Sequence, residues 1–327
     1  MKRRKFIMVF AVVMLLSACG TSQQPADGGA QSDTSAQEGS DKLNIFFTNA
    51  YLTSPYAAGQ ASAMRQYAAA NNINLQIVDG QDDAQIQLDQ IKNAVTQGVD
   101  GIIWFPGDQA STIPVVKFLD ESGVPFVVVN SKVDESVQHL VPAYVGSDYR
   151  EMGKIAGQMA LNILGDSGGN IAIINGMLGT EAQLATCEGF FETIAVNPNI
   201  KIIADQAADW DTAKAMAVME DYLIAFGDEI DLVFPLDSGM VQGAASAMVD
   251  AGVWGKIPVI TSDQGQFVLD AIANGEMSGT AMQDPQQEGE LALATIIKLI
   301  RGEPVDKWVK LPTGIIDQSN ASQFYGY

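Results

Sequence analysis

The strongest constraint on the fold of this chain is a regular alternation of two kinds of segment. Short continuous apolar runs, such as residues 43–50, 101–106 and 125–130, alternate with longer segments whose apolar residues recur at helical spacing, such as residues 84–98. Apolar strands joined by amphipathic helices are typical of parallel sheets that are covered by helices on both faces. The alternation therefore predicts an α/β fold built on doubly wound parallel sheets.

The alternation occurs twice along the chain, and short stretches of the two copies correspond. Residues 98–108 (GVDGIIWFPGD) match residues 229–238 (EIDLVFPLDS), because each has an acidic turn, an apolar strand and a proline near the end of the strand. Residues 124–132 match residues 257–265 in the same way. The chain is also long for a single core. We therefore predict two lobes of similar construction.

Asn130 and Asp263 occupy equivalent positions in this repeat, each five residues after the proline of its copy. In open α/β sheets, ligands bind beyond the carboxyl ends of the strands. Both residues are therefore candidates for ligand contact. The alternative for Asp263 is a purely structural role, as the cap of the helix that follows.

The N-terminus carries the pattern of an export signal. Four basic residues near the start are followed by an apolar stretch, residues 6–16, which is short for a membrane span. The ending LSAC resembles the lipobox of bacterial lipoproteins, so we expect residues 1–19 to be a lipoprotein signal peptide that leaves Cys19 lipidated. Residues 20–41 lack aromatic and branched aliphatic side chains and are expected to form a flexible tether. The alternative is an uncleaved anchor with a chance cysteine.

Charge and side-chain composition exclude several classes of partner. The net charge of −21 argues against nucleic acid and against electrostatic adhesion to anionic lipid. The chain has two cysteines, and Cys19 is assigned to the lipid. Cys187 therefore has no disulfide partner and is expected to be a packing residue on a helix. The single histidine, His139, has no neighbouring cysteine or histidine for a metal site. Residues 79–90 lack the glycine and glutamate of a calcium loop, so Asp82 or Asp83 is expected to cap a helix instead. We predict no metal and no cofactor.

From residue 43 to residue 320 the chain resembles the type I solute-binding proteins of sugar ABC transporters, in particular the ribose-binding group. The motifs that carry the resemblance stand in order and at the family's spacing: GVDGIIWFPGD, GVPFVVVN, YVGSDYREMGKIAGQMA, EGFFETI, ADWDTAKA, IDLVFPLDSGMVQGA and GTAMQDPQQEG. The resemblance implies two lobes that close over one ligand. It also implies three crossings between the lobes, near Ser147, Gln283 and Pro312.

These crossings give the expected domain boundaries. The first lobe would comprise residues 42–146 plus 284–312, and the second lobe residues 147–283 plus 313–327. With the lipid on Cys19 expected from the LSAC ending, we expect a monomeric receptor that is anchored to the membrane by its lipid. It would lie at the outer face of the bacterial cytoplasmic membrane or in the periplasm and deliver its ligand to an ABC permease.

The resemblance also implies a set of ligand-binding residues. Sugar hydroxyl groups pair well with carboxylates and amides, and the apolar face of a sugar packs well against aromatic rings. The matching positions in this chain are Ser54, Tyr56, Phe105, Asn130, Thr186, Trp210, Asp237, Asp263 and Gln283. Structural alternatives exist for two of them, since Trp210 could pack between the lobes and Tyr56 could be a helix staple. Trp104 is expected to be a core residue, because neighbours on a strand point to opposite faces.

Two positions depart from the ribose-binding pattern. Ser131 follows Asn130 where ribose binders usually carry an arginine, and no arginine precedes Cys187 in the stretch LAT. Two cationic donors are therefore missing, while the carboxylates Asp237 and Asp263 remain. This argues against ribose and favours a neutral sugar or a polyol, with an amine-bearing ligand as a further alternative.

Other function classes compete with transport. A sensory receptor on the same fold, binding an autoinducer or working with a histidine kinase, is the main alternative. A repressor would need a DNA-binding helix-turn-helix where this chain has the signal and the tether. An enzyme would need a poised nucleophile or base, and no serine lies in a G-x-S-x-G motif. We therefore predict a binding protein without enzymatic activity.

Overall fold

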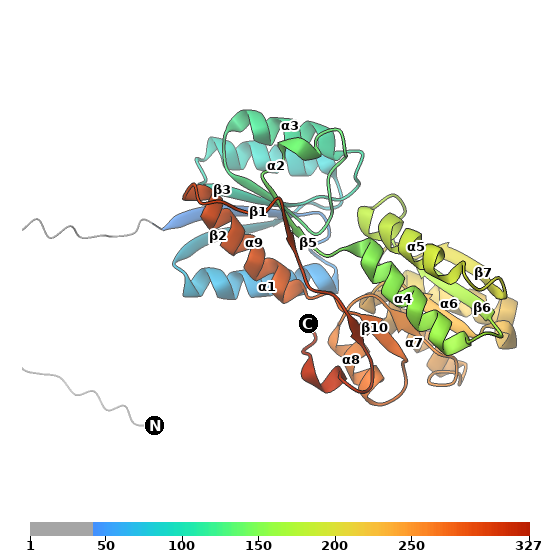
Figure 1. Ribbon diagram of the computed structural model, residues 1–327. Coiled ribbons are helices and arrows are strands. Elements are labelled where there is room, and N and C mark those ends of the chain that lie inside the picture. Colours follow the sequence, from blue (N-terminus) through green and yellow to red (C-terminus); the bar gives the residue numbers. More distant parts are fainter. Residues whose placement is uncertain (1–41) are drawn as a thin grey trace, which may run out of the picture. The chain divides into compact units, whose positions relative to one another are not determined.

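The computed structural model describes residues 42–327, and Figure 1 shows the arrangement of their helices and strands. The expected signal peptide, the lipidation at Cys19 and the tether lie outside the described residues.

The first lobe is built on a six-stranded sheet with the order β11-β5-β4-β3-β1-β2, in which every neighbouring pair is parallel. Two helices cover each face of the sheet, α1 and α9 on one side and α2 and α3 on the other (Figure 1). The strands are β1 (Leu43–Asn49), β2 (Ile73–Asp79), β3 (Gly101–Phe105), β4 (Phe126–Val129), β5 (Ala143–Gly146) and β11 (Trp308–Lys310). The helices are α1 (Pro55–Ala70), α2 (Ala84–Thr96), α3 (Thr112–Ser122) and α9 (Pro285–Ile300).

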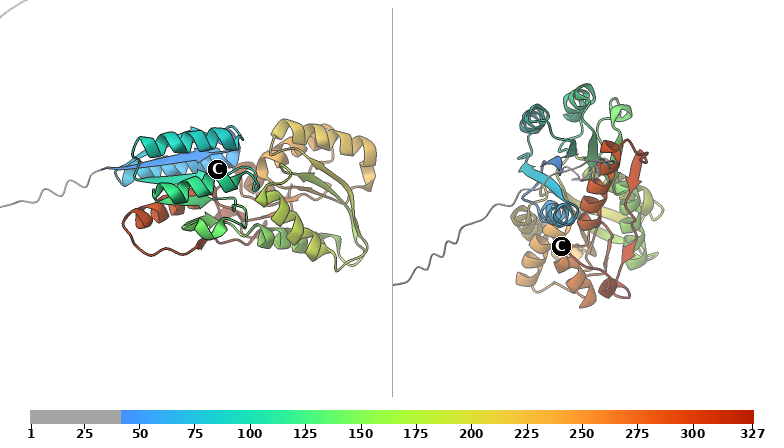
Figure 2. Two further views of the ribbon diagram at one scale, coloured as in Figure 1. Left: turned by 90° about the horizontal axis from the view of Figure 1, so that it is seen from above. Right: turned by 90° about the vertical axis from the view of Figure 1, so that its left-hand side faces the viewer.

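The second lobe contains the sheets β7-β6-β8 and β12-β10-β9, which are linked by a parallel bridge between Val233 and Val259. Only β12 runs antiparallel to its neighbour among these strands. Helices lie above and below the strands in the left view of Figure 2. The strands are β6 (Gly169–Asn175), β7 (Ile200–Ala207), β8 (Leu232–Pro235), β9 (Ile260–Thr261), β10 (Gly279–Ala281) and β12 (Ile315–Ile316). The helices are α4 (Tyr149–Leu164), α5 (Glu181–Ile194), α6 (Thr212–Phe226), α7 (Ser238–Asp250) and α8 (Gln266–Ala273), with 3-10 turns at Gly227–Glu229 and Ala321–Gln323. A further 3-10 turn, Gln138–Leu140, lies between β4 and β5 of the first lobe.

The two lobes share one strand order. The order β2-β1-β3-β4-β5 in the first lobe is repeated as β7-β6-β8-β9-β10 in the second. The predicted doubly wound α/β fold is therefore confirmed, and so is the internal repeat, since β3 and β4 correspond to β8 and β9. In this arrangement, residues that follow the ends of equivalent strands occupy equivalent places.

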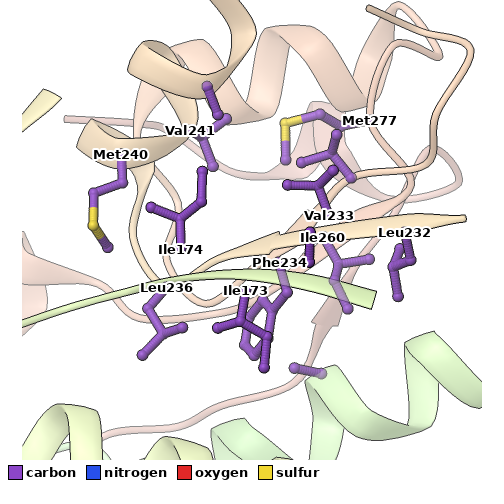
Figure 3. Close-up of a cluster of buried hydrophobic side chains, with 14 of the residues drawn as sticks. Ile173, Ile174, Leu232, Val233, Phe234, Leu236, Met240, Val241, Ile260 and Met277 are labelled. Carbon is purple, nitrogen blue, oxygen red and sulfur yellow. The ribbon is translucent and has the colours of Figure 1, made fainter. Parts of the chain in front are cut away.

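The cores of both lobes consist of apolar side chains from the strands and from the helices that cover them. Figure 3 shows part of the core of the second lobe, where Ile173 of β6 and Phe234 of β8 lie between the strands and the helices below them. In the first lobe Trp104 is 1% exposed, and its Nε1 donates to Oε1 of Gln87 at 3.1 Å. Its interpretation as a core residue is therefore confirmed. Cys187 is likewise a buried free thiol on α5.

The chain passes between the two sets of strands three times: between β5 and α4, between β10 and α9, and between β11 and β12. We propose that the lobes divide where the sequence predicted, at 146/147, 283/284 and 312/313. The capping prediction for residues 79–90 is confirmed for Asp83, whose Oδ1 accepts hydrogen bonds from the backbone N–H groups of Gln85 and Ile86 at the start of α2.

Candidate ligand-binding site

A cavity of about 70 Å³ lies where the carboxyl ends of strands from both lobes meet. Asn130 directly follows β4 in the first lobe, and Asp263 lies two residues after β9 in the second. The cavity is lined by Tyr51, Ser54, Tyr56, Phe105, Asn130, Ser131, Tyr149, Thr180, Ala182, Thr186, Trp210, Leu236, Asp237, Ser262, Asp263 and Gln283.

All nine residues that the sequence predicted as ligand contacts line this one cavity. Their contact with a ligand stays a prediction. Sequence reasoning missed the other seven lining residues. Tyr51 and Ser131 are close in sequence to predicted positions, whereas Tyr149 begins helix α4 and Thr180 precedes α5. Their closeness to strand ends could have identified Tyr51 and Ser131 as lining residues. No such signal marks Tyr149 and Thr180.

Aromatic rings enter the cavity from both lobes. Tyr51 and Phe105 of the first lobe meet edge to face, with their ring centroids 5.9 Å apart. Trp210 stands on the opposite lobe, in the turn before α6. Rings on two sides of a cavity provide apolar surfaces that a flat or ring-shaped ligand can pack between.

The backbone holds Trp210 in an unusual conformation. Its φ angle is +61°, and that of Asp209 is +52°. The backbone of two consecutive residues therefore adopts the left-handed conformation that favours glycine. The indole ring lies directly against Gly176, where an added Cβ would be only 2.0 Å from the ring atom Cη2. Gly176 is therefore required for the position of the Trp210 ring.

The variant Gly176→Ala should consequently displace the Trp210 ring and weaken ligand binding about tenfold or more, because an aromatic contact is lost. Calorimetry would measure the affinity, and tryptophan fluorescence would report the changed environment. Gly314→Ala is the matched control, since an added Cβ there has no heavy atom within 4 Å. Unchanged affinity in Gly176→Ala would exclude Trp210 as a ligand contact.

Asp263 is buried, with 2% of its surface exposed, and its carboxylate has partners inside the protein. Oδ1 accepts from the backbone N–H of Ser238 at 3.0 Å and of Gly265 at 3.4 Å. Oδ2 accepts from the hydroxyl of Tyr327 at 2.6 Å. Asp263 makes no side-chain cap on α8, whose N-cap residue is Gly265. The helix-cap alternative is therefore wrong for Asp263.

Asp237 does cap a helix, since its Oδ1 accepts from the backbone N–H of Met240 at 2.6 Å at the start of α7. Burial raises the pKa of Asp237, and the neighbouring Asp263 raises it further. Burial also raises the pKa of Asp263, while the hydroxyl of Tyr327 opposes the rise. Two desolvated carboxyl groups in one cavity favour a ligand that brings hydrogen-bond donors.

A third buried carboxyl group, Glu288 of α9, lies behind the lining residues. Its Oε2 accepts from Nε2 of Gln60 at 2.6 Å, from the hydroxyl of Tyr56 at 3.1 Å and from Nδ2 of Asn130 at 3.4 Å. Burial raises the pKa of Glu288 to about 8. Glu288 thus orients two of the predicted ligand contacts, Tyr56 and Asn130, from the side that faces away from the cavity.

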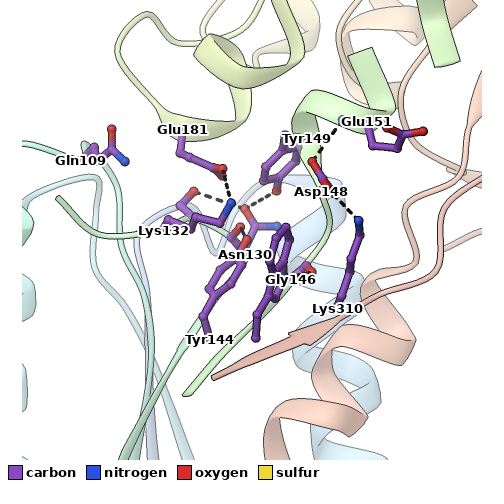
Figure 4. Close-up of polar contacts among 12 residues, drawn as sticks. Gln109, Asn130, Lys132, Tyr144, Gly146, Asp148, Tyr149, Glu151, Glu181 and Lys310 are labelled. Carbon is purple, nitrogen blue, oxygen red and sulfur yellow. Dashed lines mark hydrogen bonds and ion pairs between the residues drawn. The ribbon is translucent and has the colours of Figure 1, made fainter. Parts of the chain in front are cut away.

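Asn130 also connects the two lobes through Tyr149, as Figure 4 shows. The Tyr149 hydroxyl donates to Oδ1 of Asn130 at 2.7 Å and accepts from Nε2 of Gln283 at 2.9 Å. The φ angle of Asn130 is +65°, a conformation that asparagine tolerates better than most residues. This chain of hydrogen bonds runs beside the first and second crossings and fixes both Asn130 and Gln283.

An ion pair joins the lobes next to the cavity (Figure 4). Nζ of Lys132, which follows β4, lies 3.6 Å from Oε1 of Glu181 at the start of α5. Nζ of Lys132 also lies over the ring of Trp308, 4.2 Å from its centroid. Burial raises the pKa of Glu181 to about 7, and the charge of Lys132 opposes the rise. The two lobes are therefore in direct polar contact in this arrangement.

The cavity has no cationic side chain among its sixteen lining residues. Within residues 42–327, no group of three or more His, Cys, Asp or Glu side chains is arranged to hold a metal ion. None of the helices in that range is both long and apolar enough to cross a membrane. The site therefore offers acceptors, hydroxyl groups, amides and aromatic surface to a small ligand.

Two lobes of the same strand order, with one small cavity between the carboxyl ends of their strands, define a two-lobed receptor for a small solute. Comparison with known proteins supports this class of protein. The model of the periplasmic binding protein domain matches residues 45–304. The xylitol-binding protein of Mycolicibacterium smegmatis is 30% identical over 297 residues, covering 90% of this chain and 79% of the relative. The ribose import binding protein RbsB of Bacillus subtilis is 26% identical over 312 residues, covering 95% and 98%.

A solved structure is also similar along almost its entire length. It is the ABC transporter solute-binding protein from Mycobacterium smegmatis with bound glycerol, which has a TM-score of 0.81 and 30% identity and covers 88% of this chain and 98% of its own. The chain therefore belongs to the type I periplasmic binding protein family. The resemblance that was predicted from the sequence is confirmed, and these relatives are binding proteins.

Proposed function

We propose that this protein captures a neutral sugar or polyol between its lobes and delivers it to an ABC permease. The observation that carries the proposal is the composition of the cavity: aromatic rings from both lobes, amides, hydroxyl groups and two carboxyl groups, with no cationic side chain. Such a lining pairs with many hydroxyl groups and repels anions. Relatives named for xylitol and ribose, and one seen with glycerol, support this ligand class.

The size of the cavity favours a small ligand. At about 70 Å³, it is well below the roughly 300–1,000 Å³ of pockets for drug-sized ligands. Asn130, Asp237, Asp263 and Gln283 would bind hydroxyl groups, and Tyr56, Phe105 and Trp210 would pack against carbon atoms. Ser54 and Thr186 would add hydroxyl contacts. The Ser54 hydroxyl also caps α1 by accepting from the backbone N–H of Ala57.

Binding should close the lobes, since one ligand must touch both. Calorimetry against pentoses, hexoses, polyols, amino sugars and sugar phosphates should detect a neutral ligand and no sugar phosphate. Small-angle scattering with that ligand should give a smaller radius of gyration than the ligand-free protein. Preferential binding of a phosphorylated sugar, or an unchanged radius at saturation, would contradict the proposal.

We further propose that the mature protein is anchored through a lipid on Cys19, because LSAC follows a basic start and an apolar run. Replacing Cys19 with alanine should release the protein from membranes or block its processing, because the lipid needs the thiol. Membrane fractionation would measure this. Equal recovery of the variant and the unmodified chain in the membrane fraction would contradict the anchor.

A further inference from the structure

Tyr149 links two predicted ligand contacts that belong to different lobes. It is the first residue of α4, close to the first crossing, and it is buried, with 4% of its surface exposed. Its hydroxyl lies between two amides that line the same cavity, Asn130 of the first lobe and Gln283 of the second. Among residues 42–327, no hydrogen bond joins Asn130 to Gln283 directly. The hydrogen-bonded link between these two amides therefore runs through one phenol.

A carboxyl group behind the lining residues determines the orientation of the Asn130 amide. Oε2 of Glu288 accepts from Nε2 of Gln60 at 2.6 Å, and it faces Nδ2, the donor end of Asn130, at 3.4 Å. With its donor end toward Glu288, the amide turns Oδ1 toward Tyr149. An amide oxygen can only accept, so the Tyr149 hydroxyl must donate its proton to Oδ1, which lies 2.7 Å away.

The direction of this bond fixes the second amide as well. A phenol has one proton to donate, and burial raises the pKa of Tyr149 well above its ordinary value, so the hydroxyl keeps that proton. Since the proton points to Asn130, the hydroxyl can only accept from Gln283, whose Nε2 lies 2.9 Å away. An ordered series of donors and acceptors therefore begins at Glu288 on the first lobe and ends at Gln283 on the second.

We propose that Tyr149 is a positioning residue that couples the ligand contacts of the two lobes, because its hydroxyl makes the orientation of Gln283 depend on that of Asn130. The inference rests on the proposed binding of a sugar or polyol. Rotation about the crossings displaces atoms near them least, so the link is present before the ligand arrives. Amides that are already oriented lose less freedom on binding. Tyr149→Phe, which loses two hydrogen bonds to these amides, should therefore weaken binding about tenfold or more.

The test is the coupling between Asn130 and Gln283. Calorimetry with the best neutral ligand would give the affinities of Asn130→Gly, Gln283→Ala and the double variant; glycine adopts the φ angle of +65° at the first position without strain. The product of the two single losses should exceed the loss in the double variant about fivefold, because each change already disturbs the other amide. In the Tyr149→Phe background this excess should vanish, so that the two losses simply multiply.

Tyr222→Phe provides the matched control background. Tyr222 is also a buried tyrosine of the second lobe, but its hydroxyl donates to the carbonyl of Ile173 at 2.8 Å, within the core. The fivefold excess should persist in this background. An excess of equal size in the Tyr149→Phe background, or no excess in the unmodified protein, would overturn the role of Tyr149 and leave the proposed function standing.

A second measurement needs neither a ligand nor the Tyr149 variant. In the NMR spectrum of the ligand-free protein, the side-chain amide signal of Asn130 should shift in Gln283→Ala, because the Tyr149 hydroxyl then loses a partner. It should stay in place in Gln286→Ala, a change at an exposed glutamine three residues further on. An Asn130 signal unmoved by Gln283→Ala would overturn the coupling. Binding of no sugar or polyol by the unmodified protein would instead overturn the proposed function and, with it, the role of Tyr149 in binding.

Discussion

Replacing Asp263 with alanine should weaken ligand binding about ten- to a hundredfold. A hydrogen bond to a charged group contributes roughly 1.5–3 kcal/mol, and removal of the carboxylate also leaves the buried N–H of Ser238 without its acceptor. Calorimetry would measure the affinity, and thermal unfolding would measure the stability. We expect both to fall, with the larger effect on binding.

The variant Asp263→Asn distinguishes ligand classes, because the amide keeps one acceptor and loses the charge. A neutral sugar or polyol should then bind only moderately less tightly, whereas a ligand with an ammonium group should bind much less tightly. Asp270→Ala is the matched control, since Asp270 is an exposed carboxylate on the adjacent helix α8. If Asp263→Ala lowers the unfolding temperature and leaves the affinity unchanged, the role of Asp263 is structural.

Replacing Glu288 with leucine should lower the free energy of unfolding by about 3 kcal/mol or more. The change leaves the hydroxyl of Tyr56 and the amides of Gln60 and Asn130 without their shared acceptor, and each buried unpaired donor costs roughly 1–3 kcal/mol. Urea unfolding would measure the loss. Glu290→Leu is the matched control, since Glu290 lies exposed on the same helix. If the free energy of unfolding falls no more in Glu288→Leu than in Glu290→Leu, the hydrogen bonds to Glu288 do not stabilise the protein.

The variant Glu288→Gln should change the pH dependence of stability. The pKa of Glu288 is about 8 in the folded protein, against an ordinary value of 4.5, so folding favours the protonated form. Its contribution is fully present below pH 4.5 and is lost as the pH rises through 8. The unmodified protein should therefore lose about 3 to 5 kcal/mol relative to the glutamine variant across this range. Parallel stability curves for the two proteins would refute the raised pKa.

Much of the fold was predictable because the signals for it are local and repeated. Continuous apolar strands alternate with amphipathic helices, and the proline-bearing stretches around β3 and β8 and around β4 and β9 make the duplication recognisable in the amino-acid sequence alone. Strand order was a consequence of the fold class and had no local signal. The short strands β11 and β12 were not predicted, since segments of three and two residues show no periodicity.

The candidate site was predictable where it follows strand ends, as at Asn130, Asp237 and Asp263. Glu288 was missed because a glutamate in the first turn of a helix after a proline is common on exposed surfaces, and nothing in QQEGE marks it as fully buried. Tyr327 was missed because it belongs to a segment without a helical or strand pattern. Such residues reach the site through tertiary contacts between segments that are far apart in the sequence, and a single sequence carries no signal of these contacts.

The return of the chain to its first sheet has a consequence for the order of folding. Strand β11 pairs with β5, and helix α9 covers one face of the six-stranded sheet with Leu293 and Ile296, both fully buried. A ribosome must therefore synthesise residue 310 before the first sheet can be completed. Until then, part of its apolar face has no cover, and contacts this distant in sequence form slowly. If the proposed lipid anchor is correct and the chain is exported unfolded, such late completion would keep the first lobe open for passage through a translocation channel.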